Sequence, residues 1–61
     1  MVNVELIKEK AESLGLNISQ LEVKAGIANG TIGGWKTSKP YAETLLKVAK
    51  VLKCTVDELM I

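Results

Sequence analysis

Apolar residues recur with a helical period near the start of the chain. They lie three, seven and ten residues after the first one, which places them on one face of an α-helix with charged residues between them. These positions are Val4, Ile7, Ala11 and Leu14. Asn3 is a residue type favoured at a helix N-cap, and Gly15 is one favoured just past a helix end. The pattern predicts an amphipathic helix over residues 4–14.

A capping-box sequence, Ser-Gln-Leu-Glu, begins at Ser19. In such a box the Ser19 hydroxyl accepts from the Glu22 amide, and the Glu22 carboxylate accepts from the Ser19 amide. We therefore expect a short helix over residues 20–25 that stops at Gly26. Because a sharp reversal needs a left-handed residue, Gly26 is expected to have a positive φ.

The third segment, residues 29–36, is a weak helix by propensity. Ile32 and Trp35 lie three apart and are expected to face the core. Asn29 is a candidate N-cap. Three glycines each cost about 1 kcal/mol relative to Ala. They are Gly30, Gly33 and Gly34. Only tertiary packing would hold such a helix, and departures of this kind tend to mark functional or strained sites.

A polar turn and two further helices complete the expected fold. Pro40 disfavours a helical conformation in the residue before it, and the apolar stripe that follows predicts a helix over residues 42–52. The stripe consists of Leu45, Val48, Ala49 and Leu52. A second capping-box sequence from Thr55 predicts a terminal helix over residues 56–60. We expect one all-α domain spanning residues 1–61, a compact bundle of five short helices.

Composition excludes several classes of function. The sequence has no His, and its single cysteine, Cys54, cannot form an internal disulfide or a four-thiolate zinc site. With no His and no base partner for the thiol, we expect no enzyme, no metal, no cofactor and no small-molecule substrate. No apolar run approaches the roughly 18 residues of a membrane helix. A lone cysteine fits a reducing, cytoplasmic setting, and we interpret Cys54 as a small buried core residue.

Charge is segregated along the chain, although the net charge is only +1. Residues 1–23 carry a net −2, residues 24–53 a net +5 and residues 54–61 a net −2. A basic stretch of this kind is most often a set of solvated helix faces. Its meaning therefore depends on the motif that lies inside it.

The central run Ser19-Gln-Leu-Glu-Val-Lys-Ala-Gly-Ile-Ala-Asn-Gly-Thr-Ile-Gly-Gly-Trp35 resembles the helix-turn-helix of the phage-repressor and Cro-like DNA-binding family. A capped helix ends at Ala-Gly-Ile, and the next helix carries Thr-Ile and an aromatic residue. The stretches 43–52 and 55–59 resemble the fourth and fifth helices of these domains. The resemblance covers about residues 4–60. It implies a lambda-repressor-like fold whose second motif helix enters the DNA major groove.

The resemblance also implies a set of residues that contact bases. Asn29 suits the N6 and N7 edge of adenine, and Ala28 suits a thymine methyl group. Two of the usual reading positions hold glycine, and the chain has no Arg for guanine, so specificity would depend on Asn29, Thr31 and DNA shape. The complete set is Ala28, Asn29, Gly30, Thr31, Gly33 and Gly34.

A second set is expected to contact phosphates, which positions the protein without specifying sequence. Most of it lies in the turn after the third helix. The rest lies at the start of the second helix, where free amides favour a phosphate, although Ile18 stands where many family members carry Gln. The set is Asn17, Ser19, Gln20, Lys36, Thr37, Ser38, Lys39 and Tyr41.

Together these expectations describe a sequence-specific regulator of transcription that binds double-stranded DNA. A repressor is favoured over an activator, and half-sites one helical turn apart imply a homodimer on the operator. The alternative is an antitoxin or protein-interaction module of the same fold with DNA contact secondary, for which the three glycines are the best support. Binding to random and selected duplexes distinguishes the two.

Overall fold

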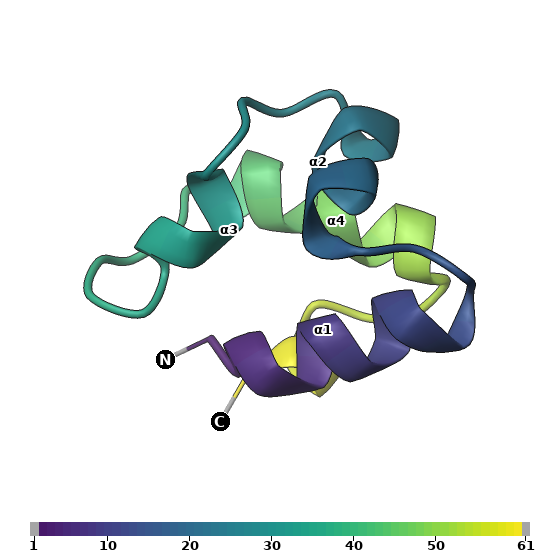
Figure 1. Ribbon diagram of the computed structural model, residues 1–61. Helices are drawn as coiled ribbons and strands as arrows, with labels where there is room; N and C mark the ends of the chain where they lie inside the picture. Colours follow the sequence, from purple (N-terminus) through teal and green to yellow (C-terminus); the bar gives the residue numbers. More distant parts are fainter. Residues whose placement is uncertain (1, 61) are drawn as a thin grey trace.

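Within residues 2–60, four α-helices and one 3-10 turn surround a core of aliphatic side chains and Trp35 (Figure 1). The computed structural model describes residues 2–60. Its elements are α1 (Val4–Ser13), α2 (Ile18–Ala25), α3 (Thr31–Gly34), α4 (Ala42–Leu52) and η1 (Asp57–Leu59). The all-α architecture is confirmed, but a fifth α-helix over residues 56–60 is wrong. The reason is that Met60 takes an extended conformation and forms an isolated antiparallel bridge with Val2.

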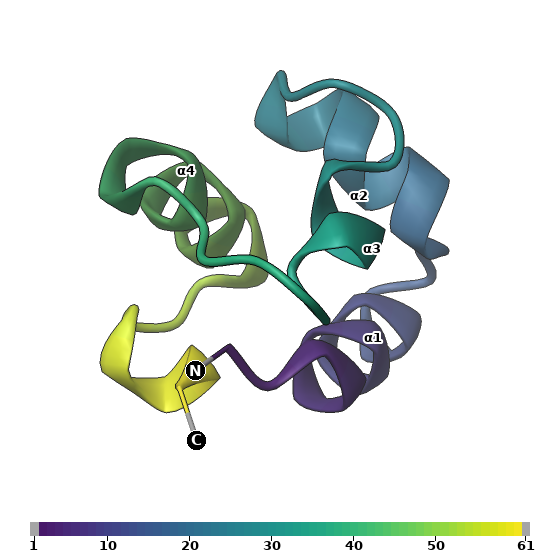
Figure 2. The same ribbon diagram turned by 90° about the vertical axis from the view of Figure 1, so that its left-hand side faces the viewer.

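The helices bury the faces that the apolar spacing marked, and α4 does so most completely. All four residues of its stripe are buried. α2 packs against α4, α1 and α3, and Figure 2 shows the helices arranged around a common interior. Ile32 is fully buried and Trp35 is 5% exposed, so the expected inner face of α3 is confirmed. No helix within residues 2–60 combines the length and apolarity that spanning a bilayer requires.

α1 begins and ends where its flanking residues dictate. The Asn3 side chain accepts from the Leu6 amide at 3.1 Å, which confirms the N-cap. Gly15 has φ +76°, and the amide of Leu16 donates to the carbonyl of Ala11. These are the features of a Schellman motif. The prediction that Leu14 faces the core is wrong: it is 46% exposed, because the turn brings Leu16 against the core instead.

The predicted end of α2 is confirmed, but its predicted start at residue 20 is wrong. The helix begins at Ile18, and the capping box is made by Asn17 and Gln20. The Gln20 amide donates to Asn17 Oδ1 at 2.8 Å, and the Asn17 amide donates to Gln20 Oε1 at 2.9 Å. The predicted box between Ser19 and Glu22 is therefore wrong, since the Glu22 carboxylate is buried and bonded elsewhere.

The segments that precede α1 and that include η1 are bonded to each other and to α1. The amide of Asn3 donates to the carbonyl of Leu59 at 2.7 Å. Lys10 Nζ lies 3.8 Å from Glu58 Oε2, an exposed pair that contributes little by itself. The Thr55 hydroxyl accepts from the Glu58 amide at 3.3 Å, so one half of the second capping box is present. These contacts place η1 beside α1.

α4 ends in a Schellman motif with no glycine. Lys53 has φ +58°, while its amide donates to the carbonyl of Lys50 and the Cys54 amide to that of Ala49. Lys53 is the only non-glycine with positive φ among residues 2–60. Cys54 is half-buried rather than fully buried, and burial raises the pKa of its thiol. The protonated thiol packs as an apolar group against the core.

Lys53→Gly is expected to raise the free energy of unfolding by about 0.5–1 kcal/mol, because glycine removes the left-handed strain of the side chain. Lys50→Gly is the matched control, since it deletes the same charge but lies inside α4. It should lower the free energy of unfolding by about 0.5–1 kcal/mol. Urea denaturation of the two variants measures both values, and equal shifts would contradict the assignment of strain to Lys53.

Candidate nucleic-acid interface

The turn between α2 and α3 depends on one left-handed glycine. Gly26 has φ +73°, which confirms the expectation from sequence. Its amide donates to the carbonyl of Val23 at 3.1 Å, and the Ile27 amide donates to that of Glu22 at 3.0 Å. A Cβ at Gly26 would meet no atom within 4 Å. Glycine is therefore required here by the backbone conformation and not by crowding.

A second left-handed glycine sets where α3 begins. Gly30 has φ +90° and is the N-cap residue, with no side-chain cap. The prediction of Asn29 as N-cap, and of a helix from 29 to 36, is therefore wrong: α3 spans only Thr31–Gly34 and continues as a turn. The Thr31 hydroxyl donates to the carbonyl of Ala28 at 2.6 Å, which closes the preceding turn.

The amides at the start of α3 are satisfied by a side chain from α2. Glu22 is 1% exposed; its Oε1 accepts from the Gly30 amide at 3.0 Å and its Oε2 from the Ile32 amide at 2.9 Å. Among residues 2–60, Glu22 is the charged residue that is buried. This role was not predicted from the sequence, although position 22 lies four residues after Ile18 and therefore on the helix face that carries Ile18, Leu21 and Ala25.

The residues expected to contact bases lie together on the turn and on α3, at the edge of the bundle (Figure 1). Ala28, Asn29 and all three glycines are exposed, while Thr31 is half-buried. A Cβ at Gly33 or Gly34 would meet nothing within 4 Å. Crowding by neighbouring atoms therefore does not explain either glycine. The outer face of α3 is mostly bare backbone.

Among the residues expected to contact phosphates, some have exposed donors and others already donate a hydrogen bond within the protein. Lys36, Lys39, Tyr41 and Ser19 are exposed. The Ser38 and Thr37 hydroxyls instead donate to the carbonyl of Gly34, at 2.8 and 3.4 Å, and so close the end of α3. A phosphate only accepts, so these two hydroxyls would have to leave their present partner to bind one.

Two amide side chains at the start of α2 keep donors for an anion. The capping box uses the oxygens of Asn17 and Gln20 as acceptors. Their NH₂ groups make no hydrogen bond to residues 2–60 and remain available. The capping box therefore also orients two donors beside the free amides of the helix start.

The lysines of the basic stretch form no ion pair with the residues that the structure describes. All six of them, from residue 24 to residue 53, are exposed. The ion pair found among residues 2–60 is the one between Lys10 and Glu58, outside this stretch. The positive charge of the central segment is therefore available to an external anion.

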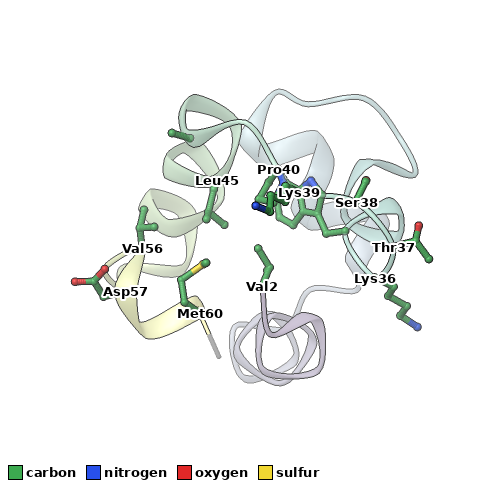
Figure 3. A pocket seen from close by; sticks show the side chains of 12 residues that line it. Val2, Lys36, Thr37, Ser38, Lys39, Pro40, Leu45, Val56, Asp57 and Met60 are labelled. Carbon is green, nitrogen blue, oxygen red and sulfur yellow. The ribbon is translucent and has the colours of Figure 1, made fainter.

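A groove of about 750 Å³ separates the turn after α3 from η1 (Figure 3). The side chains of Val2, Leu45 and Met60 point into it from three segments of the chain. Lys36 and Asp57 lie on opposite sides of it, and their charged ends point away from its floor (Figure 3). An apolar floor bordered by charged residues is typical of a surface that binds a protein partner.

Comparison with known proteins identifies this arrangement. The helix-turn-helix family profile matches residues 7–59. The chain belongs to the phage-repressor and Cro-like helix-turn-helix family. Among solved structures, the P22 c2 repressor in complex with a synthetic operator is similar, with a TM-score of 0.83 and 27% sequence identity over 98% of this chain and 94% of that one. Curated protein sequences contain no match. In this helix-turn-helix, α2 and α3 are the two motif helices.

Two glycine-to-alanine changes in the motif should act in opposite directions. Gly26→Ala is expected to lower the free energy of unfolding by about 1 kcal/mol, because an L-residue is strained at positive φ. Gly33→Ala, in equally open space within α3, should raise it by about 1 kcal/mol. Thermal and urea unfolding of both variants measure this. A stabilised Gly26→Ala protein would mean that the turn is not held in the left-handed conformation.

Proposed function

We propose that the protein is a transcriptional repressor that binds double-stranded operator DNA by placing α3 in the major groove. The observation that carries this proposal is the exposed turn and α3, built as a helix-turn-helix in a fold similar to that of the P22 c2 repressor with its synthetic operator. The free lysines of the central segment supply the sequence-independent attraction to phosphates. An occupied operator would exclude RNA polymerase.

Base recognition falls mainly to the turn before α3. Asn29 is exposed and its side chain is not needed as a cap, so the amide is free for the N6 and N7 edge of adenine. Ala28 offers a methyl group to thymine. Thr31 has its hydroxyl hydrogen engaged with the Ala28 carbonyl. Gly30, Gly33 and Gly34 offer backbone alone, so sequence-dependent DNA shape would supply the rest of the specificity.

Phosphate contacts position α3 from both sides. Lys36 and Lys39 follow α3 directly and are exposed, and Tyr41 is 84% exposed at the N-cap of α4. On the other side are the NH₂ groups of Asn17 and Gln20, with the Ser19 hydroxyl and the amides at the α2 start. Contacts of this kind set register and affinity but carry no sequence information.

A homodimer on DNA would use the groove between the turn after α3 and η1. Its proposed occupant is a second copy of this chain, because two copies related by a two-fold axis would cover the apolar side chains of Val2, Leu45 and Met60 in each other. Met60, 39% exposed at the groove, would be covered by the partner in such a dimer. A two-fold pair presents two α3 helices to half-sites one helical turn apart.

Base contact and phosphate contact are separable by mutation. Asn29→Ala is expected to cost about 1–3 kcal/mol on the preferred duplex only and to relax the preference at one base pair. Lys39→Gln should weaken binding to every duplex alike and lower the salt slope by about one unit. Titrations against a selected and a scrambled duplex at two salt concentrations measure both.

Circular dichroism and thermal unfolding control for folding of these variants. If folded Asn29→Ala loses affinity equally for both duplexes, Asn29 does not contact a base. If the lysine change leaves the salt slope unaltered and no duplex is preferred, DNA binding is not the function, and the interaction-module alternative is the better explanation of the bare face of α3.

A separate prediction concerns self-association of the protein through the groove. Met60→Glu is expected to raise the dissociation constant of the dimer about 10-fold or more, because a charge would then be buried against an apolar floor. Leu46→Glu is the matched control, since Leu46 is 46% exposed on α4 and does not line the groove. Sedimentation at increasing protein concentration measures both. Equal effects of the two changes would exclude the groove as the dimer surface.

A further inference from the structure

We infer that Glu22 is a positioning residue that sets the DNA-contacting end of α3, and thereby the preference for one operator over other duplexes. This inference rests on the proposed function. Its starting observation is the pair of hydrogen bonds from one buried carboxylate to the amides of Gly30 and Ile32. Glu22 itself is 1% exposed and cannot contact DNA, so its influence must act through α3.

α3 has almost no local means of forming. It contains four residues, Thr-Ile-Gly-Gly, and isolated helices of this length are not stable in water. Its N-cap residue, Gly30, provides no side-chain acceptor. The amides at the helix start would therefore be without intrahelical partners. The conformation of α3 must be imposed from outside it.

The Glu22 carboxylate meets this need with both of its oxygens. Each oxygen accepts from one backbone amide, at 3.0 and 2.9 Å, across eight and ten residues of sequence. Hydrogen bonds to an ionised acceptor are stronger than those between neutral groups, and burial removes most of the screening by water and salt. The negative charge also lies at the helix end where the backbone dipoles present partial positive charge.

The remaining anchors of α3 hold its inner face but not its start. Ile32 and Trp35 are buried and fix the side of the helix that faces the core. Ala28 and Asn29, which precede the helix, are exposed. Ile27 packs against the core before them, and after them the Gly30 and Ile32 amides bond to the Glu22 carboxylate. Small changes there would move Asn29 relative to a base while leaving the core intact.

Glu22→Gln tests this with almost no change of shape. Glutamine keeps one acceptor oxygen but presents an NH₂ group to the second amide, so one hydrogen bond is replaced by two facing donors. Affinity for a duplex selected from a random pool should fall at least 10-fold. Affinity for a scrambled duplex should change less than about 2-fold, because the phosphate contacts are retained. The preference ratio therefore falls.

Glu9→Gln is the matched control, since it removes the same charge from an exposed position on α1. It should change the affinity for both duplexes equally. The NMR amide signals of Gly30 and Ile32 should shift and exchange at least 10-fold faster in Glu22→Gln than in Glu9→Gln, while those of the buried α4 residue Val48 stay the same. A folded Glu22→Gln protein that keeps the wild-type preference ratio overturns the inference.

Two further measurements cover the remaining outcomes. If Glu22→Gln does not fold, Glu22→Asp replaces it, because the charge is kept while the shorter side chain cannot reach both amides. In the wild-type protein, the Gly30 amide should exchange at least 10-fold more slowly than that of its exposed neighbour Asn29, and equal rates overturn the inference. Should the wild-type protein prefer no duplex, the proposed function fails, whereas the amide signals still decide whether Glu22 positions α3.

Discussion

The helix-turn-helix of this protein depends on a buried carboxylate that joins two helices through the backbone of the second. Glu22 belongs to α2, yet its two partners are amides at the start of α3. A buried charge is tolerated only when its acceptor sites are satisfied, and removing one partner is strongly destabilising. Here both oxygens are used. The same contact therefore gives hydrogen-bond donors to the carboxylate and hydrogen-bond acceptors to the amides at the start of α3.

Much of the surrounding geometry follows from this contact. Gly26 reverses the chain directly after α2, and Gly30 points the returning amides toward the carboxylate; both glycines have positive φ. Ile32 and Trp35 then seal α3 against the core. A helix of four residues with two glycines is thus held by two hydrogen bonds to one carboxylate at its start, two apolar side chains on its inner face, and two hydroxyls at its end.

The bare outer face of α3 changes what DNA recognition by this fold would involve. No atom lies within 4 Å of a Cβ at Gly33 or Gly34, so packing does not explain either glycine. Each lowers the stability of the helix by about 1 kcal/mol relative to alanine. With few side chains available to contact bases, the orientation of α3 and the exposed lysines around it would carry more of the proposed interaction than in a helix lined with polar side chains.

The sequence by itself determined the all-α class, the bounds of α4, the caps Asn3 and Gly15, the left-handed turn at Gly26 and the burial of Ile32 and Trp35. These features are local, since they depend on apolar period and on residues whose preferred backbone conformation is known. The resemblance to the repressor family was visible in the same run. Only the tertiary structure decided the start of α2, the length of α3, the loss of the last α-helix and the inward turn of Glu22. Two acceptors, Asn17 and Ser19, compete to cap α2. Ser19 could form its capping box only if the Glu22 carboxylate were free to accept from the Ser19 amide. That carboxylate is instead bonded to the amides of Gly30 and Ile32, eight and ten residues along the chain, and no local sequence pattern predicts this contact.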